Sequence, residues 1–179
     1  IFDRVKGVQI IACGTSYHAG LVARYWLEQL AGVRCDVEVA SEFRYRRHVV
    51  DPDTLVVTIS QSGETADTLA ALRATREMGF GPSLALCNVP ESSLVRESSL
   101  VLMTRAGPEI GVASTKAFTT QLTALLLLAV VLGRRRGLSP EAEADVVRQL
   151  LALPGQVEKA LELDPIVARL AERFVDKHH

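Results

Sequence analysis

The feature that most constrains the fold is an alternation of short apolar runs with longer segments of helical periodicity. The runs are rich in Val, Ile and Leu, and most are followed by polar or glycine-containing stretches. Apolar runs separated by helices are typical of parallel strands that are buried on both faces. We predict strands over 8–13, 35–39, 55–60, 83–89 and 100–104, and the main helices over 16–30, 65–78 and 114–132.

These elements predict an α/β fold, a doubly wound five-stranded parallel sheet flanked by helices. The second run is brief and alternates polar and apolar residues, as an edge strand does, which favours a flavodoxin-like strand order. The β signal ends after residue 133, and Ser139-Pro140 is typical of a helix start. We therefore predict one α/β domain over residues 1–137 and a C-terminal helical tail over residues 138–179.

Charge and hydropathy exclude several classes of protein. The chain has 20 basic and 21 acidic residues and a net charge of -1, so nothing predicts broad attraction to nucleic acid or to an anionic membrane. The most apolar stretch, 124–132, is shorter than the about 20 residues of a membrane-spanning helix, and we expect a buried core helix there. The first residues lack the pattern of a signal peptide, which favours a cytoplasmic location.

Two polar loops follow the first and third predicted strands, and each precedes a helix. They are Cys-Gly-Thr-Ser at 13–16 and Ser-Gln-Ser-Gly-Glu-Thr at 60–65. Open α/β sheets bind ligands at the carboxyl ends of their strands, and neighbouring strands would bring the two loops face to face. Hydroxyls and free N–H groups at helix N-termini suit an anion such as phosphate. Neither loop contains Lys or Arg, so neutral donors would hold the anion.

Other interpretations of these loops stay open at the level of residues. A Ser or Thr before a helix is commonly a simple N-cap, although 60–65 holds more hydroxyls than a cap requires. Glu64 would repel phosphate, so we expect its carboxylate to point outward or to face a partner. In a third segment, 109–116, Ser114 or Thr115 could cap the longest helix, and Lys116 could neutralise an anion or simply be solvated.

Familiar cofactor motifs are missing from the sequence. The three cysteines form no CxxC pair, so neither a zinc site nor a redox motif is predicted. The first loop has no GxGxxG dinucleotide pattern, no P-loop occurs, and Ser16 is not set in a GxSxG nucleophile elbow. We expect no cofactor and no metal.

Five segments closely resemble the glucosamine-6-phosphate synthase family, whose isomerase region contains sugar-isomerase (SIS) domains. They are CGTSYHAGLVARYWLE, ASEFRYR, TISQSGETADTLAALR, CNVPESSLVRES and EIGVASTKAFTTQL, in this order. The phosphate loop alone would indicate only the SIS superfamily, whereas the other segments are more specific. The resemblance implies that residues 1–137 are the first SIS domain of that isomerase region.

The resemblance also implies two groups of substrate-binding residues. Those expected to bind the phosphate of a hexose 6-phosphate are Ser16, Ser60, Gln61, Ser62 and Thr65. Those expected near the sugar are Cys13, Gly14, Thr15, Val112 and Ser114.

The family converts fructose 6-phosphate and glutamine to glucosamine 6-phosphate and glutamate. Its catalytic residues for isomerisation lie in a second SIS domain, so we expect none in this chain and an inactive fragment. A glutaminase domain, the second SIS domain and a second copy in a homodimer are the implied partners. Two alternatives stay open: a non-catalytic SIS module that senses a sugar phosphate for regulation, and a plain interaction domain. The lack of a basic DNA-binding stretch disfavours the usual kind of regulator.

Overall fold

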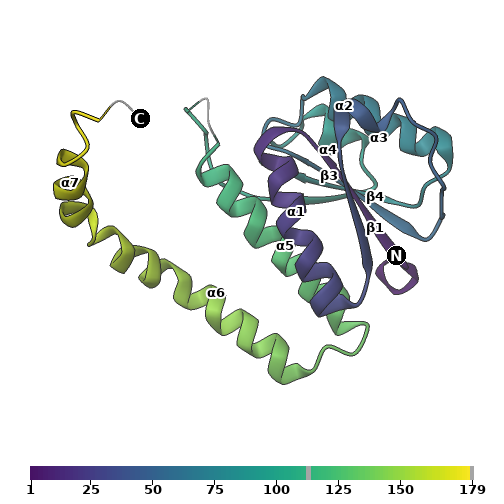
Figure 1. Ribbon diagram of the computed structural model, residues 1–179. Helices are drawn as coiled ribbons and strands as arrows, with labels where there is room; N and C mark the ends of the chain where they lie inside the picture. The colour runs from purple at the N-terminus through teal and green to yellow at the C-terminus, as the bar shows by residue number, and fades with distance from the viewer. Residues whose placement is uncertain (112–113, 178–179) are drawn as a thin grey trace. The chain divides into compact units, whose positions relative to one another are not determined.

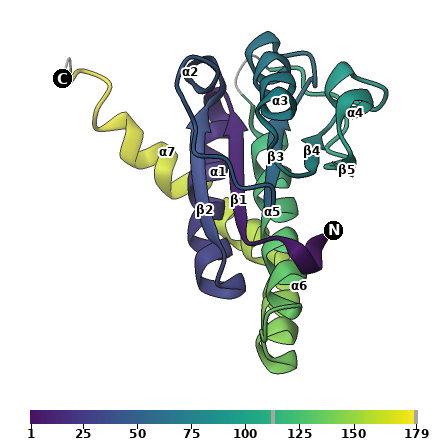
Figure 2. The ribbon, with the colours of Figure 1, turned by 90° about the vertical axis from the view of Figure 1, so that its right-hand side faces the viewer.

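Five strands form one sheet in the order β2-β1-β3-β4-β5, and every pair of neighbours is parallel (Figures 1 and 2). They are β1 (Gly7–Ala12), β2 (Arg34–Val39), β3 (Thr54–Ser60), β4 (Ser83–Cys87) and β5 (Leu100–Met103). The structure, a computed structural model, describes residues 1–111 and 114–177. The predicted fold class and strand order are confirmed.

Helices cover both faces of this sheet. They are α1 (Gly14–Ala31), α2 (Ala40–Phe43), α3 (Ala66–Met78), α4 (Ser93–Glu97) and α5 (Lys116–Arg134), after a short 3-10 turn, η1 (Phe2–Arg4). Figure 1 shows α1 and α5 side by side on one face, with α2, α3 and α4 on the other. Helix α2 is not among the main helices expected from the sequence. Its Phe43 is fully buried against the sheet, which draws this segment into the core.

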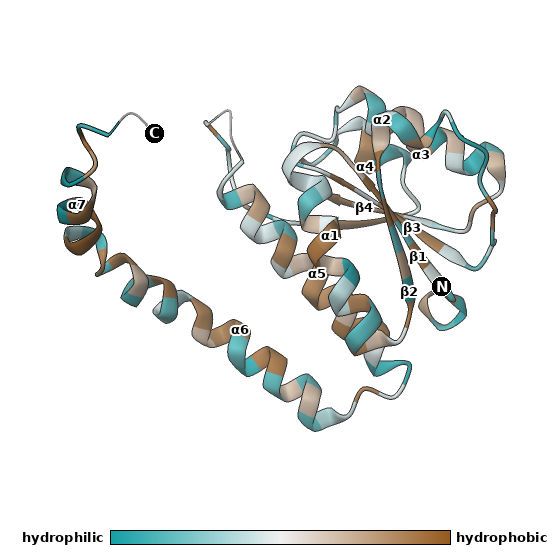
Figure 3. Cartoon of the chain, viewed as in Figure 1, coloured by the Kyte–Doolittle hydropathy of each residue, from teal (hydrophilic) through white to brown (hydrophobic). Residues whose placement is uncertain are grey.

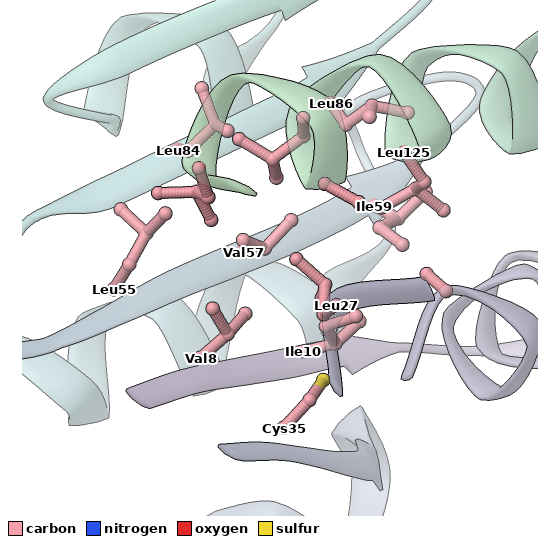
Figure 4. Close-up of a cluster of buried hydrophobic side chains, with 14 of the residues drawn as sticks. Val8, Ile10, Leu27, Cys35, Leu55, Val57, Ile59, Leu84, Leu86 and Leu125 are labelled. Carbon is pink, nitrogen blue, oxygen red and sulfur yellow. The ribbon is translucent and has the colours of Figure 1, made fainter. Parts of the chain in front are cut away.

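The main core lies between the sheet and the α1–α5 layer. In Figure 4, Ile10 of β1, Val57 of β3 and Leu86 of β4 meet Leu27 of α1 and Leu125 of α5. The residues that alternate with these on the strands are buried on the opposite face against α2, α3 and α4. Because both faces are covered, the central strands are buried almost throughout and mostly apolar, which is why the sequence shows apolar runs without strict alternation.

Helix α5 (Lys116–Arg134) is longer than 124–132, the most apolar stretch of the sequence. By length and composition alone, its 19 residues could cross a membrane. Half of the apolar window is buried within the described structure, where Leu125, Leu128 and Leu132 pack in the core. This burial is the pattern of a core helix, as expected.

By its internal contacts the chain divides into two compact units, residues 1–138 and 139–179. The second contains α6 (Pro140–Leu161) and α7 (Asp164–Glu172). The Ser139 hydroxyl accepts a hydrogen bond from the N–H of Ala142, so the predicted helix start is confirmed. Both helices carry apolar residues along their length (Figure 3), yet none of their residues is buried.

Candidate functional site

A polar cavity of about 360 Å³ lies at the carboxyl ends of β1 and β3. This volume is within the range of small-molecule sites. Its lining consists of Cys13, Gly14, Thr15, Ser16, Ile59, Ser60, Gln61, Ser62, Thr65 and Ser114. Every predicted site residue in the described part of the chain is therefore here, and Val112 lies outside the described residues. Ile59, the last buried residue before the loop, is the one lining residue that the sequence argument omitted.

The strand order explains why two loops distant in sequence line one cavity. β1 and β3 are neighbours, with Ala12 paired to Ile59, so the residues that follow them emerge side by side. From there the chain turns into α1 on one face and toward α3 on the other. This divergence is a topological switch point, where open α/β sheets bind ligands.

The two helices that begin at this cavity have no side-chain caps. Cys13 is the N-cap of α1 and Thr65 is the N-cap of α3, and neither side chain makes a capping hydrogen bond. A helix N-terminus carries unpaired N–H groups and a partial positive charge. Simple capping, the alternative interpretation of these residues, is therefore not what the structure shows at either N-cap. Two uncapped helix ends adjoin one cavity.

The hydroxyls of the second loop hold the loop itself in shape. The Ser60 Oγ accepts a hydrogen bond from the Gly63 N–H at 3.0 Å and lies 3.1 Å from the Thr65 Oγ1. The Ser62 Oγ accepts from the Glu64 N–H at 3.2 Å. Each of these serines acts as an acceptor in its bond to the backbone. The proton of Ser62 is therefore left to donate elsewhere, whereas Ser60 and Thr65 share one proton between them and leave the other.

The segment between β4 and α4 supports the second loop from behind. The Gly63 carbonyl accepts from the Leu94 N–H at 3.0 Å, and the Gln61 carbonyl accepts from the Asn88 N–H at 3.3 Å. Gly63 has φ +69°, and a Cβ there would lie 2.1 Å from the Ser92 Oγ. Only glycine fits this position, because the backbone conformation and the space both exclude a side chain.

Glu64 points away from the cavity, as predicted, and has a defined partner. Its Oε1 accepts a hydrogen bond from the Ser93 N–H at 2.7 Å, at the start of α4. This bond is the main reason why the pKa of Glu64 lies below its ordinary value of 4.5. The carboxylate thus ties the loop to α4 and is absent from the cavity lining.

The Glu64 bond predicts a dependence of stability on pH. Because the pKa is lower in the folded state, the stabilisation is fully present above the ordinary pKa and is lost as the pH falls through the folded-state pKa. We expect thermal melts to show the unmodified chain as more stable than Glu64→Gln at neutral pH. The difference should shrink below pH ~4.5. A difference that stays constant down to pH ~3 would contradict this role.

The third predicted segment contributes Ser114, but its helix is not capped by a hydroxyl. Thr115 is the N-cap of α5 but makes no side-chain capping bond, so the possibility that its hydroxyl caps this helix is not what the structure shows. The Glu109 Oε2 accepts instead from the N–H groups of Thr115 (3.3 Å) and Ala117 (3.1 Å). A carboxylate is favoured there by the helix dipole. Lys116 is exposed and is not part of the cavity lining in the described chain.

The cavity is polar without being charged. Within the described chain its lining includes no Asp, Glu, His, Lys or Arg, and Cys13 is its one titratable side chain. The described residues contain no group of three potential metal ligands. Away from the cavity, burial raises the pKa of the Cys35 thiol to about 12, which keeps that thiol protonated and unreactive.

Comparison with known proteins gives the family of this chain. The family model described as the SIS domain matches residues 1–131. The chain belongs to the SIS domain family. This SIS domain is 66% identical to the glutamine–fructose-6-phosphate aminotransferase (isomerizing) of Pseudomonas putida, over 100% of this chain and 30% of the relative. It is 61% identical to the same-named protein of Shewanella oneidensis, over 98% of this chain and 29% of the relative.

A solved structure has the same fold over nearly the whole chain. The C-terminal domain of glucosamine-fructose-6-phosphate aminotransferase from Francisella tularensis matches with a TM-score of 0.94 and 50% identity, covering 99% of this chain and 50% of that one. The resemblance drawn from the five sequence segments is confirmed. This SIS domain spans about 30% of the length of the curated relatives, and its homologues are aminotransferases of this name.

Proposed function

We propose that this SIS domain binds the phosphate of a hexose 6-phosphate as part of the isomerase region of a glutamine–fructose-6-phosphate aminotransferase. The observation that carries the proposal is the pair of uncapped helix N-termini, α1 and α3, at one uncharged cavity lined by hydroxyls. Backbone N–H groups and the helix dipoles favour a dianion there without a basic side chain. The names of the relatives supply the choice of a hexose phosphate.

The proposed phosphate side of the cavity is the 60–65 loop with Ser16 opposite. Ser62 bonds to the loop backbone as an acceptor, which leaves its proton for a phosphate oxygen. Ser60 also accepts from the backbone, and its contact with Thr65 uses the proton of one of these two hydroxyls and leaves the other for the anion. The remaining phosphate contacts assigned to this side are Gln61, Thr65 and Ser16. A loop held by several internal bonds loses little freedom when the anion binds, which favours affinity.

The proposed sugar side consists of Cys13, Gly14, Thr15 and Ser114, together with Val112. Of the described residues that line the cavity, none is an Asp, Glu, His or Lys, and the thiol of Cys13 is the one titratable group. We therefore assign binding and orientation to this domain and no catalytic residue. Ring opening and amino transfer in the parent enzyme need acid, base and amine groups from other parts of it.

The second unit, residues 139–179, has exposed apolar helix faces that support the proposed partners. Its two helices expose apolar residues, among them Leu151, Leu161, Ile166 and Leu170. Apolar helix faces of this kind are normally covered by another surface. We assign residues 138–179 as the connection toward a second SIS domain of a longer, cytoplasmic enzyme that also has a glutaminase domain and forms a homodimer.

A thermal melt with matched ligands tests the binding proposal. We expect glucosamine 6-phosphate at ~100 times its dissociation constant to stabilise the chain by about 2.7 kcal/mol, whereas unphosphorylated glucosamine should have no effect at the same concentration. The variant with Ser62→Ala and Thr65→Ala together should lose this response, because two hydroxyls leave the proposed phosphate side.

The matched control removes two hydroxyls elsewhere, with Ser41→Ala and Thr123→Ala, which lie outside the cavity lining. That variant should respond to glucosamine 6-phosphate as the unmodified chain does. An equal response to phosphorylated and unphosphorylated sugar, or no response at millimolar phosphosugar, would contradict phosphate binding by this domain.

A further inference from the structure

A buried amide of α5 lies directly behind the cavity. Gln121 is 2% exposed, and its Nε2 is 3.0 Å from the Oγ of Ser16, which lines the cavity from the first turn of α1. Gln121 itself is not among the lining residues. The contact joins α5 to the first loop, across 105 residues of sequence.

The direction of this hydrogen bond decides what Ser16 offers to a ligand. A hydroxyl has one proton to donate, and a neutral amide has both a donor and an acceptor end. With the NH₂ group of Gln121 as the donor, the Ser16 Oγ accepts and keeps its own proton. With the amide reversed, the Gln121 Oε1 would accept a hydrogen bond from the Ser16 hydroxyl. Ser16 would then have only lone pairs to offer toward the cavity. Only the first arrangement suits an anion.

The other end of the amide shows that this arrangement has a cost. The Gln121 Oε1 is buried and has no hydrogen-bond partner in the described part of the chain. A buried polar atom without a partner is unfavourable and is rare in folded proteins. An apolar side chain would fill the same space without this penalty, so packing alone does not account for a glutamine at position 121.

From this geometry we infer that Gln121 is a positioning residue for phosphate binding, which holds the Ser16 hydroxyl as a donor toward the anion. The inference rests on the proposed function and deepens it at the same cavity. Gln121 acts through Ser16 and does not touch the ligand. Its effect is therefore on the phosphate end of the substrate and disappears when the Ser16 hydroxyl is absent.

Calorimetric titration of four forms of the chain tests this: unmodified, Gln121→Met, Ser16→Ala and the double variant. The probes are glucosamine 6-phosphate and inorganic phosphate. Gln121→Met keeps the length of the side chain without its donor, and we expect it to weaken both ligands about 10-fold. In the Ser16→Ala background the same substitution should have no further effect, because the hydroxyl that it orients is gone.

A control variant separates positioning from general loss of stability. Leu132→Val also removes buried atoms from α5 but lies far along the helix from Gln121. It should lower the melting temperature and leave both affinities unchanged. In a ¹⁵N-labelled, ligand-free chain, Ser16→Ala should shift the side-chain amide signals of Gln121, which a purely apolar packing role would not predict.

The outcomes distinguish this inference from the proposal on which it rests. If the unmodified chain binds phosphosugar through Ser62 and Thr65 while Gln121→Met binds equally well, the positioning role is wrong and the proposed function stands. Additive effects of Ser16→Ala and Gln121→Met, or weaker binding of the phosphosugar alone with inorganic phosphate unaffected, would also overturn it. If the unmodified chain binds neither ligand, both proposals fail.

Discussion

Gly63→Ala is expected to destabilise the chain by about 3 kcal/mol and to abolish phosphosugar binding. The added Cβ would lie 2.1 Å from the Ser92 Oγ, 2.6 Å from the Ser92 Cβ and 2.9 Å from the Cys87 Sγ. Its φ of +69° also disfavours any residue with a side chain. To relieve these contacts the 60–65 loop must move away from the β4–α4 segment, which displaces the proposed phosphate donors.

The matched control is Gly79→Ala, at the C-terminal end of α3. Gly79 has a similar positive φ of +86°, but no atom lies within 4 Å of an added Cβ. It therefore measures backbone strain alone, which we expect to cost about 1 kcal/mol. Urea unfolding and phosphosugar titration of both variants compare the two effects. Equal destabilisation, with binding retained in Gly63→Ala, would contradict a close-packed support behind the loop.

Leu125→Ala is expected to lower the free energy of unfolding by about 2–5 kcal/mol. Leu125 is fully buried where α5 packs against α1 and the sheet, in the core drawn in Figure 4. Removing its side chain leaves a cavity that the surrounding strands and helices fill only in part, so lost contacts add to the lost transfer free energy. Urea unfolding measures the change.

Leu127→Ala provides the comparison on the same helix. Leu127 is two residues away and 43% exposed, so less of its surface leaves water on folding. We expect a loss of less than about 1 kcal/mol. If the two variants were equally destabilised, the face of α5 that the structure assigns to the core would be wrong.

Much of this fold could be predicted because both faces of the sheet are covered. Full coverage buries the central strands almost throughout and makes them mostly apolar. The strand predicted over 55–60 accordingly matches β3 (Thr54–Ser60) within one residue. Boundaries differ by one or two residues, since helix ends depend on tertiary partners. The short helix α2 was missed because it has four residues and a polar, charged sequence on both sides of Phe43, and one buried aromatic gives little local signal.

The candidate site was predictable to the extent that its chemistry is local. Hydroxyls and glycine in 13–16 and 60–65, after apolar runs, indicated two helix N-termini and an anion, and the structure brings both loops to one cavity. Glu109 and Gln121 carried no such signal. A glutamate in a loop and a glutamine in a helix are ordinarily solvated. Glu109 instead bonds N–H groups six and eight residues further along the chain, and the bond of Gln121 to Ser16 depends on how distant segments pack.

The sequence by itself determined the alternation of strands and helices, the two polar loops and the absence of Lys and Arg from them, because these depend on residue type and near neighbours. The tertiary structure alone decided the rest. It set the register in which Ala12 pairs with Ile59, gave Glu64 the N–H of Ser93 as its partner, and placed the amide of Gln121 behind Ser16. The physical reason is that these contacts join residues up to 105 positions apart, and the packing of helices on the sheet sets their distances and directions.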